Sequence, residues 1–323
     1  MATRSHPSAQ SKDMRSTDAF AGAVPCGRAA NAVFWGKQFA GLRRMAGGGL
    51  PFPKCPGRCK RPQGAATPLV RSPTHRSTLY ALRSTLYPLP MCGRITLSYK
   101  EAQELAQDMG VNVDQLPPEY APSWNIAPTQ EHPIVTYDRE EREVKLAKWG
   151  LINHWAKDAK TGYKQINARA ETIDRSPAYR GALKKHRCLV PVDGFYEWVG
   201  PKGNRQPYWF HKPDGKLFFF AGLFESWQPE GEPERQLTFT IVTTAANQYM
   251  GRIHDRMPVI LAGEEAQDTW LYPGEADVSK LKALLQPAAE DELVAWPVSQ
   301  QANNVKNNEP WLLDEVVLEE PAY

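Results

Sequence analysis

The sequence predicts an α+β protein whose core is a mainly antiparallel β-sheet flanked by helices. Three observations support this class. Apolar, β-branched and aromatic runs that are typical of strands recur along the second part of the chain. Stretches with helix start and stop signals stand among them. The strand-like runs and the helix-like stretches do not alternate in the regular βαβ order of a parallel sheet.

The expected elements follow in chain order. Residues 98–109 (SYKEAQELAQDM) predict a helix, with Ser98 as its N-cap and Gly110 as its stop. The runs PIVTY and EVKLAKWGL predict a hairpin. A second helix is expected from Ser176 and Pro177, a capping residue followed by proline at the first helical position. Further strands are expected at 187–192, 216–224 and 237–245, and further helices at 264–272 and 277–286.

Charge divides the 323-residue chain near residue 90. Residues 1–90 hold 14 of the 39 basic and 2 of the 36 acidic side chains, which leaves 25 basic and 34 acidic side chains in residues 91–323. The first segment is rich in Gly, Pro, Ser and Arg and has no strand or helix period, so we expect a disordered extension. The second segment is acidic, so any affinity for phosphate must come from a local basic face.

Three origins are open for residues 1–90. They can be an organelle leader that a protease removes, a leader that the protein cleaves from itself, or a segment that is not made because translation starts at Met91. Each of these leaves residues 91–323 as one domain, and each exposes Cys92 as the first residue of the mature chain.

The five cysteines do not suggest a disulfide framework, which favours a reducing compartment. We therefore expect a cytoplasmic, nucleoid-associated protein in a bacterium and a nuclear or organellar one in a eukaryote. Cys188 lies in the apolar run CLVPV and is expected to be a buried core thiol. We expect no metal and no organic cofactor.

Five short motifs concentrate reactive side chains in the second segment. They supply a thiol, an amide, a carboxylate, an imidazole and several arginines among loops and strand ends, where such groups are usually displayed. No single motif is specific, but their joint occurrence in this order is. The motifs are MCGR at 91–94, WNIAP at 124–128, INARAET at 166–172, DGFYEW at 193–198 and IHDRMP at 253–258.

This set of motifs, with VKNN at 305–308, resembles the SRAP family, the abasic-site processing proteins of the HMCES/YedK type. The resemblance covers about residues 91–320 and leaves residues 1–90 outside. It implies an SRAP-like fold, removal of the initiator methionine, and a DNA damage response in which the protein shields abasic sites in single-stranded DNA through a covalent link. We expect a monomer, and replication-fork proteins are further candidate partners.

The chemistry of a terminal cysteine agrees with this resemblance. An abasic sugar opens to an aldehyde, and a free α-amine with a pKa of about 8 attacks it to form a Schiff base. The thiol of the same cysteine can then add to the imine carbon and close a five-membered thiazolidine ring. An internal Cys92 would carry an amide nitrogen, which is not nucleophilic. Gly93 leaves room for a DNA backbone to approach.

Three further residues are candidates for catalysis. Glu197 is flanked by aromatic side chains, and desolvation there would raise the pKa of its carboxyl and suit it for proton transfer. His254 could protonate the sugar oxygen or assist reversal and strand cleavage. Asn167 would hold the sugar or the amine by hydrogen bonds. A surface glutamate, a structural histidine and a turn-forming asparagine are the alternative interpretations.

The candidates for DNA binding are arginines and aromatic side chains. Arg94, Arg169 and Arg256 are the expected phosphate contacts, because guanidinium geometry matches phosphate. Trp155 and Trp149 are candidates for stacking on bases, although Trp149 fits a core position equally well. Asn125 and Thr243 are weaker candidates for the wall of the pocket.

Two other functions remain open. Cys92 with His254 and either Asn167 or Glu197 superficially matches a thiol peptidase, whose favoured act would be the release of the segment before Cys92. A non-catalytic reader of damaged or modified DNA would bind without a covalent adduct. The position of a cysteine directly after a methionine favours catalysis, because a reader has no need of it.

Overall fold

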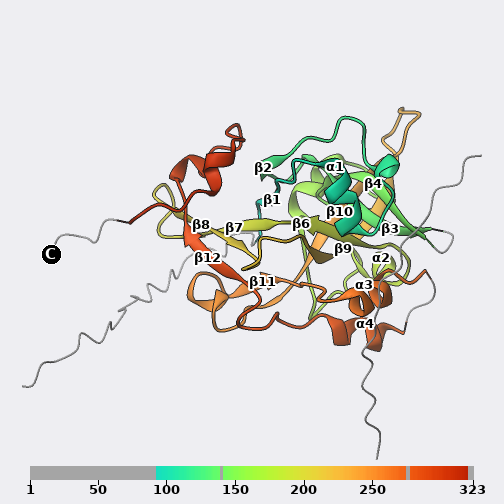
Figure 1. Cartoon of the computed structure of the whole chain (residues 1–323). Coiled ribbons are helices and arrows are strands. Elements are labelled where there is room, and N and C mark those ends of the chain that lie inside the picture. The colour runs from blue at the N-terminus through green and yellow to red at the C-terminus, as the bar shows by residue number, and fades with distance from the viewer. Residues whose placement is uncertain (1–91, 139–140, 274–276, 319–323) are drawn as a thin grey trace, which may run out of the picture. The chain divides into compact units, whose positions relative to one another are not determined.

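The computed structural model describes residues 92–138, 141–273 and 277–318, so the extension 1–90 lies outside the described part (Figure 1). Twelve strands make up two sheets within these residues. They are β1 (Ile95–Leu97), β2 (Ser123–Ile126), β3 (Glu131–Asp138), β4 (Glu141–Trp149), β5 (Asn167–Arg169), β6 (Arg187–Val192), β7 (Gly194–Val199), β8 (Gln206–His211), β9 (Phe218–Trp227), β10 (Gln236–Ala245), β11 (Arg256–Pro258) and β12 (Val294–Pro297).

The larger sheet closes on itself. Its strand order is β11-β10-β4-β3-β6-β9, and β9 also pairs with β10, so five of these strands form a ring. Most pairings are antiparallel, but β4 and β5 both run parallel to β10. Apolar side chains from these strands, including Leu189, Phe220 and Ile241, are fully buried in the main core. Hydrophobic burial of this kind is the main favourable term in folding.

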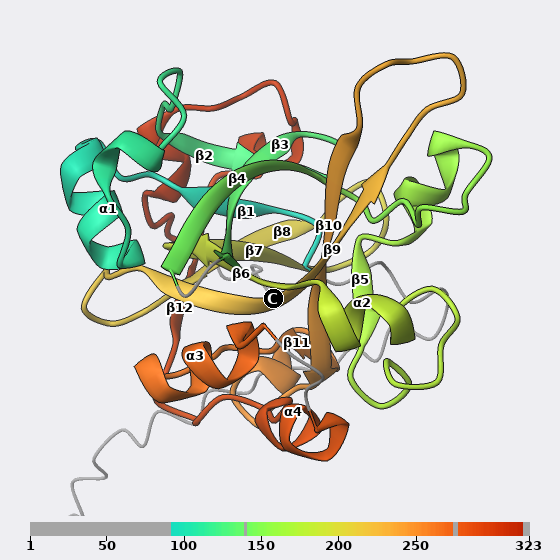
Figure 2. The same ribbon diagram turned by 90° about the vertical axis from the view of Figure 1, so that its right-hand side faces the viewer.

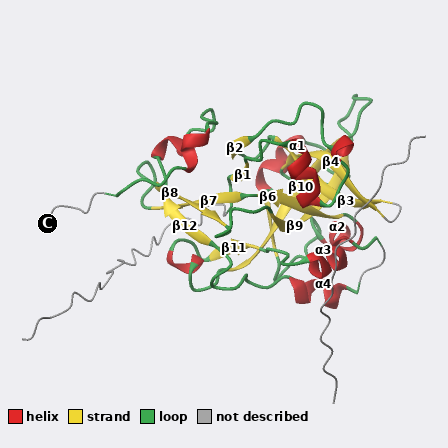
Figure 3. Ribbon diagram, in the orientation of Figure 1, coloured by secondary structure: helices red, strands yellow, loops and turns green. Residues whose placement is uncertain are grey.

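The smaller sheet carries the MCGR and FYEW motifs. Its order is β12-β8-β7-β1-β2, and all its pairings are antiparallel. β6 of the larger sheet is followed after one residue by β7 of the smaller sheet, so the two sheets are directly connected. Strands and loops dominate the described part, as the colouring by secondary structure shows (Figure 3).

Four short α-helices in the described part of the chain flank the sheets. They are α1 (Ala102–Met109), α2 (Arg180–Lys185), α3 (Glu264–Leu271) and α4 (Val278–Leu284). Figure 2 shows α3 and α4 side by side, away from α1. α3 is fixed to β6 because the guanidinium of Arg187 donates to the carbonyl of Trp270 at 2.7 Å. No helix in the described ranges is long and apolar enough to cross a bilayer.

The predicted elements are largely confirmed, with two corrections. The hairpin is β3 and β4, and Gly110 ends α1 in the left-handed conformation at φ 68°. Ser98 is not the N-cap of α1, because its backbone N–H and its hydroxyl both bind the carboxylate of Asp193, and the helix begins at Ala102 instead. The second helix begins at Arg180, four residues after Ser176.

Candidate active site

Cys92, the first residue that the structure describes, contacts Glu197. The backbone N–H of Cys92 donates a hydrogen bond of 2.5 Å to Oε1 of Glu197, which lies 105 positions further along the chain. Cys92 is 0 % exposed and Glu197 is 3 % exposed. A backbone nitrogen, a thiol and a carboxyl group therefore share one enclosed position.

Strand pairing in the smaller sheet places these two residues together. β1 lies between β2 and β7, with Ile95 opposite Phe195. The backbone N–H of Tyr196 donates to the carbonyl of Arg94 at 3.0 Å. The MCGR and FYEW motifs thus run side by side in opposite directions, which brings the start of the first motif to the end of the second.

Burial controls the protonation of this pair. Desolvation raises the pKa of Glu197 to about 8, and the charge of Asp255 adds to the rise, while hydrogen bonds from the backbone of Cys92 and Trp198 oppose it. Burial, together with the charge of Glu197, raises the pKa of the Cys92 thiol well above its ordinary value. Near neutral pH the Glu197 carboxyl can therefore hold and donate a proton, and Cys92 is a thiol rather than a thiolate.

A groove of about 420 Å³ opens beside the pair. Gly93, Arg94 and Glu197 line one part of it, and Trp198 lies next to them. The rest is lined by residues that the motifs did not single out, namely Lys202, Gly203, Arg205 and Asn303. A signal for them existed in the sequence, because the turn after FYEW (VGPKGNRQ) is short, rich in glycine and basic.

Arg94 and Asn125 form one buried unit. Nη1 of Arg94 donates to Oδ1 of Asn125 at 2.5 Å and to the carbonyl of Ala302 at 2.8 Å. The amide of Asn125 in turn donates to the carbonyls of Asn304 and Asn307 at 3.1 and 2.6 Å. Asn125 therefore holds the segment 302–307 against the groove, and its polar atoms are occupied within the protein instead of facing a ligand.

A second group of the predicted residues gathers along β10. Arg169 lies opposite Thr243, and Arg256 lies opposite Ala245. The guanidinium of Arg256 donates to the carbonyl and the hydroxyl of Thr243 at 2.7 and 3.1 Å and pairs with the Glu171 carboxylate at 2.5 Å. Arg169 is exposed, so its guanidinium is accessible to a phosphate.

Asn167 and His254 border the same strand. Asn167 begins β5 opposite Ile241 and is half-buried. The His254 side chain is 14 % exposed, and its Nδ1 accepts the backbone N–H of Arg256 at 3.1 Å. His254 directly precedes Asp255, whose charge contributes to the raised pKa of the buried Glu197 carboxyl.

The two candidate tryptophans have different places. Trp149 is 0 % exposed, its indole N–H donates to the carbonyl of Ile166 at 3.0 Å, and its ring stacks on Phe239. The interpretation of Trp149 as a base-stacking residue is therefore wrong, because no face of the ring is accessible. Trp155 is 59 % exposed and can reach a ligand.

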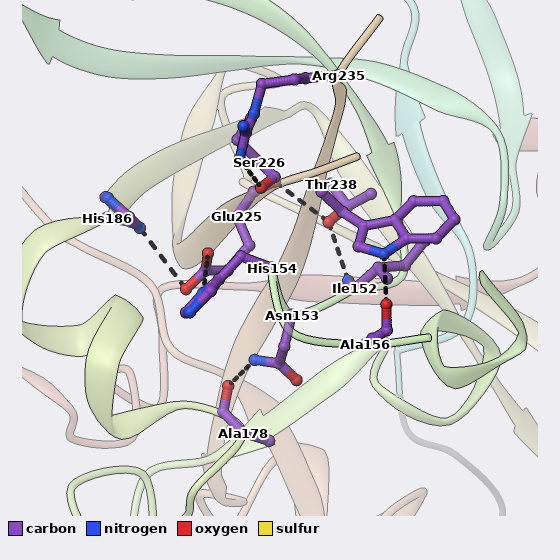
Figure 4. A network of polar contacts seen from close by, with 11 residues as sticks. Ile152, Asn153, His154, Ala156, Ala178, His186, Glu225, Ser226, Arg235 and Thr238 are labelled. Carbon is purple, nitrogen blue, oxygen red and sulfur yellow. Dashed lines mark hydrogen bonds and ion pairs between the residues drawn. The ribbon is translucent and has the colours of Figure 1, made fainter. Parts of the chain in front are cut away.

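The loop that carries Trp155 is anchored on both sides. The amide of Asn153 donates to the carbonyl of Ala178 at 2.6 Å, and the indole N–H of Trp227 donates to the carbonyl of Ala156 at 2.7 Å (Figure 4). The exposed ring thus projects from a backbone that is fixed before and after it. A fixed backbone lowers the entropy cost when a base stacks on the ring.

A buried carboxylate supports the same loop. The Glu225 side chain, 6 % exposed, lies between two histidines, with Oε2 3.4 Å from Nδ1 of His154 and Oε1 3.6 Å from Nδ1 of His186 (Figure 4). His154 directly precedes Trp155. Within the ranges that the structure describes, no group of three or more His, Cys, Asp and Glu side chains could hold a metal ion. Cys188 is a free, buried thiol, as predicted.

The fold and the site define an α+β domain built around a cysteine–glutamate pair beside a basic groove. A family model described as SOS response associated peptidase (SRAP) matches residues 91–305, and the chain belongs to this family.

Similar proteins carry related names. The chain is 44 % identical over 229 residues to the abasic site processing protein YoqW of Bacillus subtilis (strain 168), a match that covers 69 % of this chain and 99 % of that protein. It is 32 % identical over 228 residues to the abasic site processing protein HMCES of Xenopus tropicalis, covering 62 % and 68 % of the two chains.

The fold has a relative among solved structures. A crystal structure of a protein from Bacteroides thetaiotaomicron matches with a TM-score of 0.62 and 26 % identity, covering 70 % of this chain and 100 % of that one. The predicted α+β class with an antiparallel core is confirmed.

Proposed function

We propose that the protein captures abasic sites in single-stranded DNA by forming a thiazolidine with Cys92 as the first residue of the mature chain. The observation that carries the proposal is the contact of 2.5 Å between the Cys92 nitrogen and the Glu197 carboxyl in a buried site. The names of the relatives, abasic site processing proteins, support the choice of substrate.

The reaction uses the groups of the pair in sequence. When Cys92 is terminal, its α-ammonium favours the ionised form of the neighbouring Glu197. The Glu197 carboxylate takes a proton from this ammonium, and the free amine adds to the C1′ aldehyde of the opened sugar. The protonated Glu197 then gives this proton to the carbinolamine oxygen, which leaves as water and yields an imine. The Cys92 sulfur adds to the imine carbon while its proton passes to the nitrogen, so one water is lost overall.

The conformation of Cys92 supports a free terminus. Its φ is 45°, in the left-handed region that an L-residue with a side chain adopts at a cost of about 1 kcal/mol. This conformational cost disappears when no residue precedes Cys92, because the φ angle is defined by the carbonyl carbon of the preceding residue. Residues 1–91 lie outside the described part of the chain, so the proposal concerns the chemistry of Cys92 and not the route by which it is exposed.

The DNA strand would reach the pair along the cationic side chains. Arg169 on the β10 side supplies an exposed guanidinium group for a phosphate, and Trp155 offers a face to a base. Arg256 would bind a phosphate only by exchanging its contacts with Glu171 and Thr243. Single strands are preferred in this proposal, because an aldehyde within a stacked duplex is hard to reach. Asn167 and His254 contribute hydrogen bonds and proton transfer near the sugar.

A denaturing gel tests the proposal. The family model matches residues 91–305, and 69 % of this chain covers 99 % of the relative from Bacillus subtilis, so we expect a chain without residues 1–91 to fold alone. A chain that starts at Cys92 is mixed with an oligonucleotide whose single uracil has been excised. We expect a heat-stable shifted band with wild type and none with Cys92→Ala, and an equal band from that variant would exclude the thiazolidine.

Lyase and peptidase activities are further candidates on the same site. An imine at C1′ makes β-elimination of the 3′ phosphate possible, and His254 is a candidate base, so His254→Ala should reduce strand cleavage more than capture. A peptidase that acts on other proteins is disfavoured, because burial and Glu197 raise the pKa of the Cys92 thiol, whereas a thiol nucleophile is activated by a lowered pKa.

A further inference from the structure

An acidic side chain already binds the arginine that begins β11. Glu171 and Arg256 form an ion pair that joins strands on opposite edges of β10. Thr243 of β10 shows this arrangement, because it pairs with Arg169 of β5 on one edge and with Pro258 of β11 on the other. Glu171 lies two residues beyond the end of β5, so the ion pair spans the end of β10.

The contact between these two side chains is forked. Nη1 of Arg256 lies 2.5 Å from Oε1 of Glu171, and Nη2 lies 3.1 Å from Oε2. Nη2 also donates to the carbonyl and the hydroxyl of Thr243 at 2.7 and 3.1 Å. A guanidinium makes the same paired contact with a carboxylate and with a phosphate. A phosphate can therefore reach this edge of Arg256 only after the Glu171 carboxylate has left it.

Exposure and charge make Glu171 the partner that can move. Its side chain is 48 % exposed, whereas the side chain of Arg256 is 14 % exposed and is held by Thr243. The hydrogen bond from Arg256 lowers the pKa of the Glu171 carboxyl, and the charge of the exposed Arg169 contributes to this shift. The carboxylate is thus ionised near neutral pH. Ion pairs at such exposed positions stabilise a protein little, so an incoming phosphodiester can replace this one.

We propose that Glu171 is an internal competitor of the DNA strand: its carboxylate holds the forked edge of Arg256 in the free protein and yields it to a phosphodiester when single-stranded DNA binds. The inference rests on the proposed function, which places Arg256 among the DNA contacts, and adds a residue that limits the affinity for the strand. Because the competitor belongs to the protein, it lowers the apparent affinity at every DNA concentration. It also hastens release from undamaged strand, whereas a captured abasic site is held by its covalent link.

Neutralising the carboxylate tests the proposal. The probe is a fluorescent thymidine oligonucleotide without an abasic site, and its anisotropy reports the affinity of the chain that starts at Cys92. Glu171→Gln should bind the probe about fivefold more tightly than wild type, because a neutral amide competes only weakly for the guanidinium. In a chase with unlabelled strand, release of the probe should slow by a similar factor.

A matched control removes the same charge elsewhere. Glu143 on β4 is 42 % exposed and pairs with Lys145 at 2.9 Å, so its exposure and ion pairing resemble those of Glu171. Glu143→Gln should leave the affinity for the probe unchanged. An equal gain from both variants would overturn the proposal, because the gain would then come from net charge alone.

A second pair of variants shows whether the effect passes through Arg256. Arg256→Gln should weaken binding, and adding Glu171→Gln to it should give less than about a twofold gain, because the guanidinium for which Glu171 competes is absent. A full gain in that background would overturn the proposal. Should Arg256→Gln not fold, Arg256→Lys takes its place, since an ammonium cannot make the forked contact. Weaker binding by Glu171→Gln alone would also overturn the proposal, because Glu171 would then position Arg256 for the phosphate.

The affinity and the adduct measurements separate the two proposals. The probe carries no aldehyde, so its binding does not depend on the chemistry at Cys92. If wild type forms no heat-stable adduct with abasic DNA, the proposed function fails whatever Glu171 does. If wild type forms the adduct but Glu171→Gln binds the probe no more tightly than wild type, the competitor is wrong and the proposed function stands. Failure of both proteins to bind the probe would overturn the competitor as well.

Discussion

The backbone nitrogen of Cys92 lies 2.5 Å from Oε1 of Glu197 in a position closed to solvent. In a chain whose Cys92 is preceded by another residue, this contact is an amide hydrogen bond to a carboxyl with a raised pKa. When Cys92 is terminal, the same geometry sets an α-ammonium against a carboxylate. The identity of the group before Cys92 therefore decides whether the pair is an inert hydrogen bond or a proton-transfer site.

Glu197→Gln should slow adduct formation by roughly 10²–10⁴-fold, the range of general acid–base catalysis, and leave affinity for undamaged single strand within a few-fold. The amide keeps the size of the side chain but cannot shuttle the proton. Single-turnover rates and binding isotherms provide the comparison. Glu225→Gln, at a buried carboxylate outside the pair, is the control for the rate, and parallel losses of rate and affinity in Glu197→Gln would assign the residue a structural role.

The stability of the chain of residues 1–323, in which Cys92 is preceded by another residue, should depend on pH through Glu197. Its pKa of about 8 in the folded protein lies above the usual value of 4.5, so the folded state holds a proton that the unfolded state releases. Stability from this group is complete below pH 4.5 and is lost as pH rises towards 8, with a slope of at most about 1.4 kcal/mol per pH unit.

Thermal unfolding of residues 1–323 across this pH window measures the effect. Glu197→Gln should flatten the curve, because the amide does not titrate. The chain that starts at Cys92 should also show a shallower slope, since its ammonium favours the carboxylate. Identical slopes in all three proteins would show that Glu197 is not the group responsible.

Sequence patterns predicted the strands well, because runs such as RCLVPV and LTFTIVTTA combine β-branched residues with burial on both faces. The patterns were less reliable in assigning polar residues that can either cap a helix or bind a side chain remote in the sequence. Ser98 resembles a helix cap, but Asp193, which is remote in the sequence, competes for its N–H and hydroxyl. The pairing of Cys92 with Glu197 depends on the register of β1 and β7, which no local pattern specifies.

Side chains on the groove were missed for a similar reason. Lys202 and Arg205 lie in a turn whose composition is that of any exposed basic loop, and only the fold brings them next to Arg94. Trp149 and Trp155 belong to one stretch of sequence, KWGLINHW, yet one is in the core and the other is exposed. A tryptophan's hydrophobicity alone does not distinguish these positions.

Trp155→Ala should weaken binding of single-stranded DNA by about 1–3 kcal/mol if a base stacks on the ring, with little change in thermal stability. Trp149→Ala should do the opposite, destabilising the protein by about 3–5 kcal/mol, because it creates a cavity next to Phe239. Fluorescence titration and thermal melts separate the two effects. Tyr163→Ala, an exposed aromatic on a neighbouring turn, controls for non-specific loss, and equal weakening by it would remove the special role of Trp155.

Glu225→Gln should weaken the binding of single-stranded DNA in part as Trp155→Ala does, although the buried Glu225 side chain does not contact DNA. Loss of the negative charge between His154 and His186 frees the loop that carries Trp155, so affinity should fall several-fold while the rate at saturating DNA stays unchanged. In the double variant Glu225→Gln/Trp155→Ala, the two losses should not add, because they act through one ring. Full additivity would mean that Glu225 does not position Trp155.

The most direct test of the account is the mass of the adduct formed by two chains that differ in one residue. One starts at Cys92, and the other carries a single glycine before it, so the thiol, Glu197 and the groove are the same. Both are incubated with abasic single-stranded DNA, heated and measured by intact-mass spectrometry. The account predicts a heat-stable adduct, at the combined mass minus one water, for the Cys92-terminal chain alone. A heat-stable adduct of equal yield from the glycine-extended chain would contradict it, because no thiazolidine can form on an amide nitrogen.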